Sequence, residues 1–205
     1  MRTLPVGPRA LLIELDGQSA VLNLYAQIEQ QRKKGWQSSL VDVVPAANTI
    51  LLDGVNDPEA LATELKTWPQ STTSPIVGQL VELATIYDGE DLEEVAHFWG
   101  MTREEVVSTH TGTTFSVAFC GFSPGFAYLT GLPDGLSVPR KSSPRPVVPA
   151  GSVALAGEYA GIYPRRSPGG WQIIGRTDAV LWDTDREPAT LLSPGTRARF
   201  IEVKE

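Results

Sequence analysis

Glycine and proline are concentrated in the second half of this 205-residue chain, and they limit what that half can fold into. Twelve of the nineteen glycines and ten of the sixteen prolines follow Thr111. Such frequent helix breakers favour short strands joined by turns with fixed or positive φ angles. The sequence therefore predicts a β-rich second half whose stiff loops can present a preorganised binding surface.

Basic residues gather in the densest part of this region. The segment from Arg140 to Arg176 holds six basic residues and one acidic residue, Glu158, although the whole chain has a formal charge of −7. Guanidinium groups and the N–H groups of glycine-rich turns can converge on a carboxylate or phosphate. We therefore expect an anion site with Arg140, Arg145 and Arg176 as candidate ligands, and solvation at the surface is the alternative for each.

Composition argues against several classes of protein. The net negative charge disfavours non-specific nucleic-acid binding. No apolar run is long enough to cross a bilayer and the N-terminus has no apolar signal segment, so we expect a cytoplasmic protein without membrane contact. The chain has one cysteine, Cys120, and two histidines, His97 and His110, so no metal site is expected.

The first half alternates strand-like and helix-like patterns. Apolar residues at helical spacing predict one helix that ends near Gly35 and a second that starts at Asp57-Pro58-Glu59. Strand-like runs occupy residues 10–15, 39–44, 49–52 and 76–87. The order β-α-β-β-α-β is the split βαβ pattern, so we predict a ferredoxin-like domain over residues 1–84, serving in packing or docking.

The second half begins with two short helices. The first is predicted over 91–100 with Asp91 as its N-cap, and the second starts at Thr102, which forms a capping box with Glu105. Strand-like runs follow at residues 114–122, 152–155, 171–176, 179–182 and 197–203. Regular turn signals between them predict a closed or nearly closed β-barrel over residues 85–205, and hence an α+β protein of two domains.

Individual side chains are candidates for chemistry, each with a structural alternative. His110 could carry a proton or donate to an amide, or it could cap a helix. Asp88 could orient an amide nitrogen or a water, or form a turn. Tyr163 could donate to a carbonyl oxygen, or pack on the barrel rim. Cys120 is expected to be a buried small apolar residue, because nothing near it in sequence would lower its pKa.

Aromatic residues suggest a docking surface. Phe122, Phe126 and Tyr128 are expected at the edge of the barrel as an interface for a partner, and Trp171 is expected inside it. The sequence has no Gly-x-Ser-x-Gly elbow and no Gly-x-x-x-x-Gly-Lys phosphate loop. These missing motifs favour an active site that is shared with a second polypeptide.

Dense motifs from Tyr87 onward resemble those of a known family. They include Tyr87-Asp88-Gly89, His110-Thr111, Gly121-Phe122-x-Pro124-Gly125-Phe126, Val148-Pro149-Ala150-Gly151-Ser152, Gly161-Ile162-Tyr163-Pro164 and Ser167-Pro168-Gly169-Gly170-Trp171. The chain is similar to the B subunit of the ATP-dependent 5-oxoprolinase, in a family that also includes allophanate hydrolase subunit 1 and the KipI inhibitors of a sporulation kinase. The resemblance covers essentially the whole chain, weakly before Tyr87.

The resemblance implies a ferredoxin-like domain followed by a cyclophilin-like β-barrel that works only in a complex. The implied partner is a related-barrel subunit (allophanate hydrolase subunit 2, or the C subunit of 5-oxoprolinase), together with a third, hydrolase-like subunit. The implied reaction converts 5-oxoproline, ATP and water to glutamate, ADP and phosphate. ATP is therefore an expected cofactor, at a site not wholly on this chain, and no metal is expected on it.

The family leaves other functions open. The chain could be an allophanate hydrolase subunit, a carboxyltransferase subunit of the urea amidolyase type, or an inhibitor of a sensor histidine kinase. The 5-oxoproline hypothesis ranks above allophanate, because allophanate hydrolysis is ordinarily carried by an amidase-signature serine enzyme and no such signature is present. Peptidyl-prolyl isomerisation is suggested by the barrel class alone and is weaker, because fold does not imply function.

Overall fold

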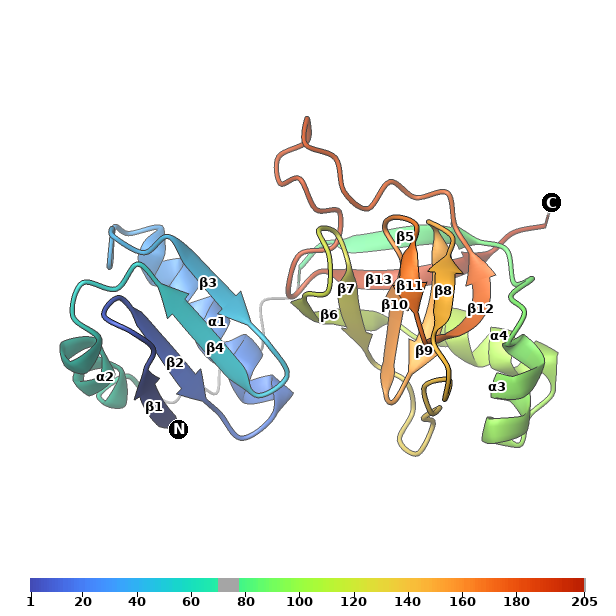
Figure 1. The fold of residues 1–205 in the computed structure, drawn as a ribbon, viewed down its shortest axis with the longest axis horizontal. Coiled ribbons are helices and arrows are strands. Elements are labelled where there is room, and N and C mark those ends of the chain that lie inside the picture. Colours follow the sequence, from blue (N-terminus) through green and yellow to red (C-terminus); the bar gives the residue numbers. More distant parts are fainter. Residues whose placement is uncertain (70–77, 205) are drawn as a thin grey trace. The chain divides into compact units, whose positions relative to one another are not determined.

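A computed structural model describes residues 1–69 and 78–204 of the chain (Figure 1). By its internal contacts the chain divides into two compact units, Met1–Val77 and Gly78–Glu205. The first two residues of the strand predicted over 76–87 lie outside the described residues. Each unit is therefore described by itself.

The N-terminal unit packs two helices against a four-stranded antiparallel sheet in the order β1-β2-β4-β3. Its elements are β1 (Arg2–Pro5), β2 (Ala10–Glu14), α1 (Gln18–Arg32), β3 (Asp42–Pro45), β4 (Thr49–Asp53) and α2 (Pro58–Lys66). Alternate residues of β2 and β4, such as Leu11 and Ile50, point into the core, where they meet Ile28 of α1 and Leu61 of α2.

The predicted ferredoxin-like pattern is confirmed, with one strand exchanged. Because β4 lies between β2 and β3, the elements β2, α1 and β3 form the split βαβ unit. The edge place beside β2 is occupied by β1, however, and not by the strand predicted over 76–87. β1 was not predicted, because it is short and ends in Pro5, a residue that strands tolerate at a sheet edge.

The C-terminal unit is a nearly closed barrel with strand order β12-β9-β10-β7-β6-β13-β5. The strands are β5 (Leu80–Thr85), β6 (Phe115–Cys120), β7 (Ala127–Thr130), β9 (Ser152–Ala156), β10 (Tyr159–Ile162), β12 (Gln172–Arg176) and β13 (Arg197–Glu202). Ile86 and Arg176 exchange two backbone hydrogen bonds of 2.9 and 2.8 Å, which join the ends of β5 and β12. This bridge closes the sheet on itself.

Smaller elements surround the barrel. A separate two-stranded ribbon is formed by β8 (Arg145–Val148) and β11 (Ser167–Gly169), and the helices are α3 (Leu92–Trp99) and α4 (Arg103–Gly112). The predicted helix starts are confirmed: Asp57 accepts hydrogen bonds from the first turn of α2, and Thr102 and Glu105 form a capping box on α4.

Two predictions for strands were wrong. Residues 179–182 form no strand in the part of the chain that the structure describes, and Trp182 makes only an isolated bridge to Thr190. The strand predicted for the first domain, β5, pairs in parallel with β13 and so belongs to the barrel. The pattern of β5 predicts a strand correctly, but its partner is decided by the tertiary packing of residues more than 100 positions later.

Closure of the barrel at Ile86 generates a prediction. A Cβ added to Gly175 would overlap the carbonyl of Ile86, whereas one added to helical Gly112 would meet nothing within 4 Å. Gly175→Ala should therefore lower the free energy of unfolding by about 1–3 kcal/mol, the usual cost of overpacking. Urea denaturation measures the loss. Gly112→Ala is the control and should be neutral or slightly stabilising; equal stability of the two variants would contradict this account of closure.

Candidate functional site

Residues from several barrel segments converge on a pocket of about 270 Å³ in the C-terminal unit. Its floor and sides combine aromatic rings, two cations and a glycine-proline turn. The lining residues are Phe122, Phe126, Tyr128, Arg140, Lys141, Pro144, Tyr163, Pro168, Gly169, Gly170 and Trp171. Arg140, a predicted anion ligand, and Tyr163, a predicted donor to a carbonyl oxygen, thus line the same concave surface.

Tyr163 is the hydrogen-bond donor of this pocket. Its side chain is 2% exposed, and the pocket wall is shaped around it, because a Cβ on Gly169 would overlap its hydroxyl. Burial raises the pKa of Tyr163, and the N–H of Trp171, together with the charge of Arg140, offsets part of that rise. The phenol is therefore protonated at neutral pH, and because Trp171 bonds its oxygen, its proton remains available to a ligand.

Arg140 is the cation of the pocket that is left uncompensated. It is exposed and forms no hydrogen bond or ion pair with any residue in the described ranges. The neighbouring cations differ: Lys141 and Arg145 both bind the carboxylate of Asp91. A ligand carboxylate entering the pocket would therefore find Arg140 free to form a charged, bidentate pair.

Asp91 is a buried carboxylate that ties the pocket to α3. It accepts hydrogen bonds from Lys141 Nζ at 2.7 Å, from Arg145 Nη2 at 2.6 and 2.7 Å, and from the backbone N–H of Ile173 at 2.7 Å. Burial pushes the pKa of Asp91 upward, but the hydrogen bonds from Lys141, Ile173 and Arg145 together hold it below its usual range. The group is charged at neutral pH.

The same cations hold both walls of the pocket. The backbone N–H of Lys141 donates to Gly170 O at 2.8 Å, and Arg145 Nη1 donates to Trp171 O at 3.3 Å. Arg145 Nε also pairs with Glu90 at 2.6 Å. The segment that carries Arg140 is thereby fixed against the turn that faces Tyr163. Arg145, predicted to bind an anion, is placed to organise the pocket.

The N-cap prediction for Asp91 is confirmed for its position and wrong for its side chain. Asp91 does stand at the N-cap position of α3, but its side chain makes no capping bond to the residues that the structure describes. The three hydrogen-bond donors just described compete for the same oxygens. A charged Arg and Lys offer stronger, charge-assisted bonds than a free amide of the first helical turn.

Other predicted site residues lie elsewhere. Arg176 Nε pairs with Asp88 at 2.8 Å, and both side chains are close to half exposed. Neither is among the described residues that line the pocket. Asp88 therefore serves as the partner of Arg176 in the structure, next to the bridge that closes the barrel.

His110 lies in the barrel core and not in the pocket. Its ring is fully buried between Phe115 and Phe200, with ring centroids 4.9 and 4.3 Å away, and Nδ1 hydrogen-bonds the hydroxyl of Tyr87 at 2.7 Å. Burial lowers the pKa of His110 to about 3, so the imidazole is neutral. The structure thus gives this histidine a packing environment and does not bring it together with Tyr163.

The three predicted interface aromatics separate by exposure. Phe122 is 59% exposed at the mouth of the pocket and Tyr128 is half-buried. Phe126 was expected at the edge, but it is 2% exposed, because its ring packs edge-on against Tyr163 and Trp171 at centroid distances of 5.4 and 5.3 Å. Of the three, Phe122 offers the most surface to a partner.

Cys120 was expected to be buried but is only partly so, and it is not activated as a nucleophile. Burial raises its pKa to about 11, and its thiol donates to Leu192 O at 3.2 Å, so it remains a thiol at neutral pH. Among the described residues, no group of three His, Cys, Asp or Glu side chains is arranged to hold a metal ion. Within the same residues, no helix combines the length and apolar character needed to span a bilayer.

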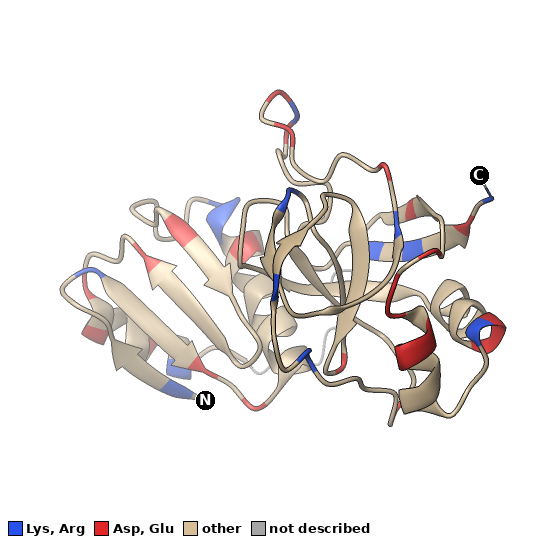
Figure 2. Ribbon diagram, turned by 45° about the vertical axis from the view of Figure 1, so that its right-hand side comes forward, with Lys and Arg blue, Asp and Glu red and all other residues tan. Residues whose placement is uncertain are grey.

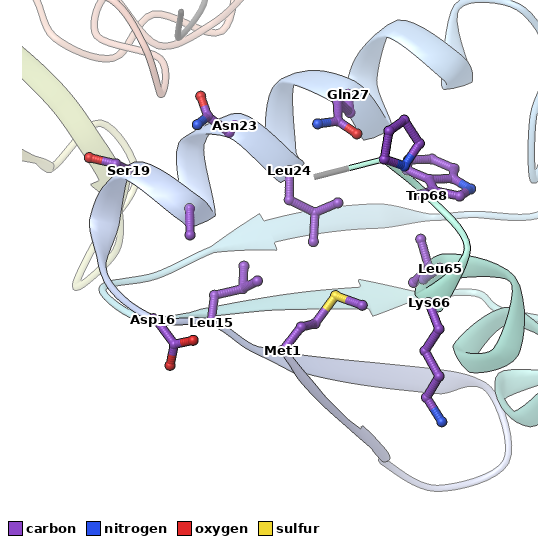
Figure 3. Close-up of a pocket in the computed structure, with 12 residues that line it drawn as sticks. Met1, Leu15, Asp16, Ser19, Asn23, Leu24, Gln27, Leu65, Lys66 and Trp68 are labelled. Carbon is purple, nitrogen blue, oxygen red and sulfur yellow. The ribbon is translucent and has the colours of Figure 1, made fainter. Parts of the chain in front are cut away.

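A larger cavity of about 420 Å³ lies in the N-terminal unit (Figure 3). It runs along α1 and is bordered by the end of α2, with Leu15, Leu24 and Leu65 projecting into it. Its polar residues come from α1, from Asp16 before it and from Lys66 at the end of α2, and they do not converge on a point. The barrel pocket, with a free cation and a buried phenol side by side, is therefore the candidate site.

The sequence model of one protein family, the carboxyltransferase domain, subdomain C and D, matches residues 1–192. The chain belongs to this family. This carboxyltransferase-domain chain is 40% identical over 190 residues to the 5-oxoprolinase B subunit of Haemophilus influenzae. The match covers 86% of this chain and 89% of that protein. The chain is 38% identical over 175 residues to the protein of the same name from Escherichia coli O157:H7, covering 82% and 80%.

Solved structures share the carboxyltransferase-domain fold. The crystal structure of TTHA0988 superposes with a TM-score of 0.81 at 35% identity over 96% of this chain, which spans 40% of the length of TTHA0988. PH0987 of Pyrococcus horikoshii matches with a TM-score of 0.59 at 31% identity, over 100% of this chain and 98% of that one. The urea amidolyase of K. lactis, 18% identical with a TM-score of 0.74, shows the likeness of fold alone.

The sequence analysis missed two residues that shape the site. Lys141 was seen beside Arg140, but no local pattern shows that its charge is consumed by a carboxylate fifty positions earlier. Trp171 was placed inside the barrel, which is confirmed, yet it also lines the pocket. Asp91 was interpreted only as an N-cap, because the donors to its carboxylate lie fifty or more positions later in the chain.

The Asp91 network generates a prediction for stability. Asp91→Asn would remove the buried carboxylate that Arg145 and Lys141 share and leave them only the exposed Glu90 and Glu94, so it should lower the free energy of unfolding at pH 7 by about 3 kcal/mol. Chemical denaturation measures the change. Glu94→Gln removes the other, exposed partner of Lys141 and should cost no more than about 0.5 kcal/mol. Similar losses in both variants would mean that the buried carboxylate has no special role.

The same network predicts a pH dependence. Because folding lowers the pKa of Asp91, its stabilisation is complete above the unfolded pKa of about 3.9 and is lost as the pH falls through the folded pKa. The difference in stability between the wild type and Asp91→Asn should therefore shrink as the pH is lowered from 5 toward 3. Denaturation curves across that range provide the test, and a constant difference would exclude titration of Asp91 as its source.

Proposed function

We propose that this chain is the B subunit of an ATP-dependent 5-oxoprolinase and supplies one wall of the site where the lactam is opened to glutamate. Two relatives that bear this name, 38% and 40% identical over most of their length, support the proposal. The observation that carries it is the pairing, in one pocket, of an uncompensated cation, Arg140, with the buried hydroxyl of Tyr163.

The pocket suits a small lactam that bears a carboxylate. Arg140 can bind the carboxylate with two parallel hydrogen bonds. The Tyr163 hydroxyl can donate to the ring carbonyl oxygen, where negative charge develops when the carbonyl is attacked. Phe126 and Trp171 supply apolar surface for the ring methylenes. A volume of about 270 Å³ fits a compact substrate of this kind.

The same pocket does not fit ATP. Lys141 and Arg145 are already paired with Asp91, Glu94 and Glu90, so Arg140 alone would face a triphosphate. The sequence also lacks a phosphate loop. We therefore assign ATP to the partner subunits, and no step of the chemistry on this chain is routed through it.

A partner is required for the chemistry to proceed. The related-barrel partner, the C subunit of 5-oxoprolinase, would cover the pocket mouth, and a third, hydrolase-like subunit would complete a cytoplasmic hetero-oligomer. Covering the mouth excludes water and strengthens the interactions of Arg140 and Tyr163 with the substrate. The urea amidolyase alternative rests on a likeness of fold alone. No specific observation favours the KipI alternative.

Reconstitution tests the shared site. The isolated chain should not turn over 5-oxoproline with ATP, because this chain has neither an activated nucleophile motif nor a phosphate loop. Co-expression with the related-barrel and hydrolase-like subunits should restore glutamate production, with allophanate and urea as substrate controls. Turnover of 5-oxoproline by this chain alone would contradict a shared site, and turnover by the complex of urea or allophanate instead would contradict the substrate.

Two variants of the reconstituted complex separate binding from chemistry. Arg140→Ala should raise KM for 5-oxoproline about tenfold or more with a smaller change in kcat, because it removes a charged hydrogen bond to the ground state. Tyr163→Phe should lower kcat by about 100-fold, as loss of one oxyanion donor does. Arg166→Ala, an exposed cation outside the pocket lining, is the control and should match the wild type. Unchanged kinetics in both pocket variants would place the reaction elsewhere.

A further inference from the structure

One long loop of the barrel unit stands beside the candidate site. It runs from β12 to β13 over residues 177–196, all of them described, and contains no strand. Figure 1 shows it as the red-brown excursion that rises from the barrel on the side away from α3. Loops of this length without secondary structure are uncommon in compact domains and are usually functional.

An internal arginine makes this loop rigid. Arg186 donates to four backbone carbonyls of the loop: Nε to Pro188 O at 3.3 Å, Nη1 to Val180 O at 3.2 Å, and Nη2 to Leu181 O at 3.3 Å and Ala189 O at 2.9 Å. Backbone hydrogen bonds from Asp183 to Ala189 and from Leu191 to Leu181 complete the closure. The loop is therefore ordered before anything binds to it, which lowers the entropic cost of association.

The rigid loop exposes apolar side chains next to the pocket. Val180 is 60% exposed, Trp182 is 43% exposed, and Phe122 at the pocket mouth is 59% exposed. They belong to one region, because a Cβ on Gly125, in the turn that carries Phe122, would approach Trp182 Cβ to 2.8 Å. Phe122 also has a positive φ of 67°, which a bulky residue adopts only when its surroundings impose it.

Acidic residues border these apolar side chains. The loop carries four acids, and its single base is Arg186, whose guanidinium is taken up by the loop carbonyls. The acids are Asp178, Asp183, Asp185 and Glu187. Figure 2 shows acidic segments along this loop. A partner that fits must therefore offer an apolar socket bordered by lysine or arginine.

We propose that the loop between β12 and β13, called the Trp182 loop, is the docking surface for a protein partner with a basic-rimmed apolar socket. The contact would be made by Val180 and Trp182 of this loop and by the neighbouring Phe122. This inference rests on the proposed function, and it assigns that partner to the related-barrel subunit. Because Phe122 belongs both to this surface and to the pocket lining, a partner seated on Trp182 would also cover the pocket mouth. Exposed tryptophans that become buried when a partner binds dominate the binding energy of many interfaces.

A second copy of this chain is a poorer occupant. A symmetric contact would place the same acidic border of each copy against the other, since both partners use the same patch. The formal charge of −7 on each chain adds to that repulsion. Charge complementarity therefore selects a different, basic surface.

The test purifies the related-barrel subunit separately and measures its affinity for variants of the full chain by isothermal titration calorimetry. Trp182→Ser keeps the Cβ that packs on Gly125 and should weaken binding about 30-fold or more, the usual cost of losing a tryptophan hot spot. Phe98→Ser on α3 is the matched control: Phe98 is 42% exposed but distant from the loop, so affinity should not change.

Two further variants keep the test decisive. Arg186→Ala retains Trp182 but loosens the loop, so it should also weaken binding. Val180→Asp changes a well-exposed side chain and should also weaken binding, so it replaces Trp182→Ser if that variant folds poorly. Circular dichroism and thermal melting report whether each variant is folded. Affinity should fall with rising salt, because the acidic border faces basic groups.

The outcomes separate this inference from the proposed function. If the wild type forms an active complex and Trp182→Ser with Val180→Asp bind as tightly as the wild type, the docking surface is wrong and the function stands. If the wild type binds no related-barrel subunit and the subunits together show no 5-oxoprolinase activity, both are wrong. Self-association of the chain through Trp182 would also overturn the inference.

Discussion

A single buried carboxylate organises the candidate site of this barrel. Asp91 receives Arg145, Lys141 and a backbone amide of β12 at distances of 2.6–2.7 Å, and it sits where α3 leaves the barrel wall. Taking a carboxylate out of water is costly, so such a group persists only where charged donors compensate it. Through these donors, Asp91 fixes the segment before β8 against the turn after β11. The pocket walls depend on that contact.

The same interaction decides which charge is left for a ligand. Three cations cluster near the pocket in the sequence, at Arg140, Lys141 and Arg145. Asp91 pairs with two of them, and the exposed Glu94 and Glu90 complete their compensation, so that one guanidinium faces the pocket without a partner among the described residues. One free cation beside one buried phenol suits a small monoanion better than a polyphosphate. Charge also governs the proposed recognition between subunits, because the acidic Trp182 loop next to the pocket mouth selects a basic partner surface.

Local patterns predicted the parts of the fold whose causes are local. The capping box at Thr102 and the N-cap at Asp57 are satisfied within four residues, and both helices begin there. β5 was recognised as a strand but was given to the wrong sheet, because its parallel partner β13 lies more than 100 residues away. β1 was missed, since a short run that ends in proline carries little strand signal.

The candidate site shows the same contrast between local patterns, which could be predicted, and contacts between distant residues, which could not. Arg140 and Tyr163 were each predicted as candidate site residues, and the pocket brings them together. His110 and Phe126 had equally suggestive sequence contexts, but packing buries the first between Phe115 and Phe200 and the second beneath Tyr163. The consumption of Arg145 and Lys141 by Asp91 could not be read from the sequence, because it joins residues about fifty positions apart.

The central claim is that Arg140 and Tyr163 together hold a carboxylate-bearing lactam. A crystal structure of the assembled enzyme with 5-oxoproline bound tests it most directly. The account predicts the substrate carboxylate on the Arg140 guanidinium and the ring carbonyl oxygen within hydrogen-bond distance of the Tyr163 hydroxyl. A substrate bound outside this pocket, or within it but with neither group in contact, would contradict the account.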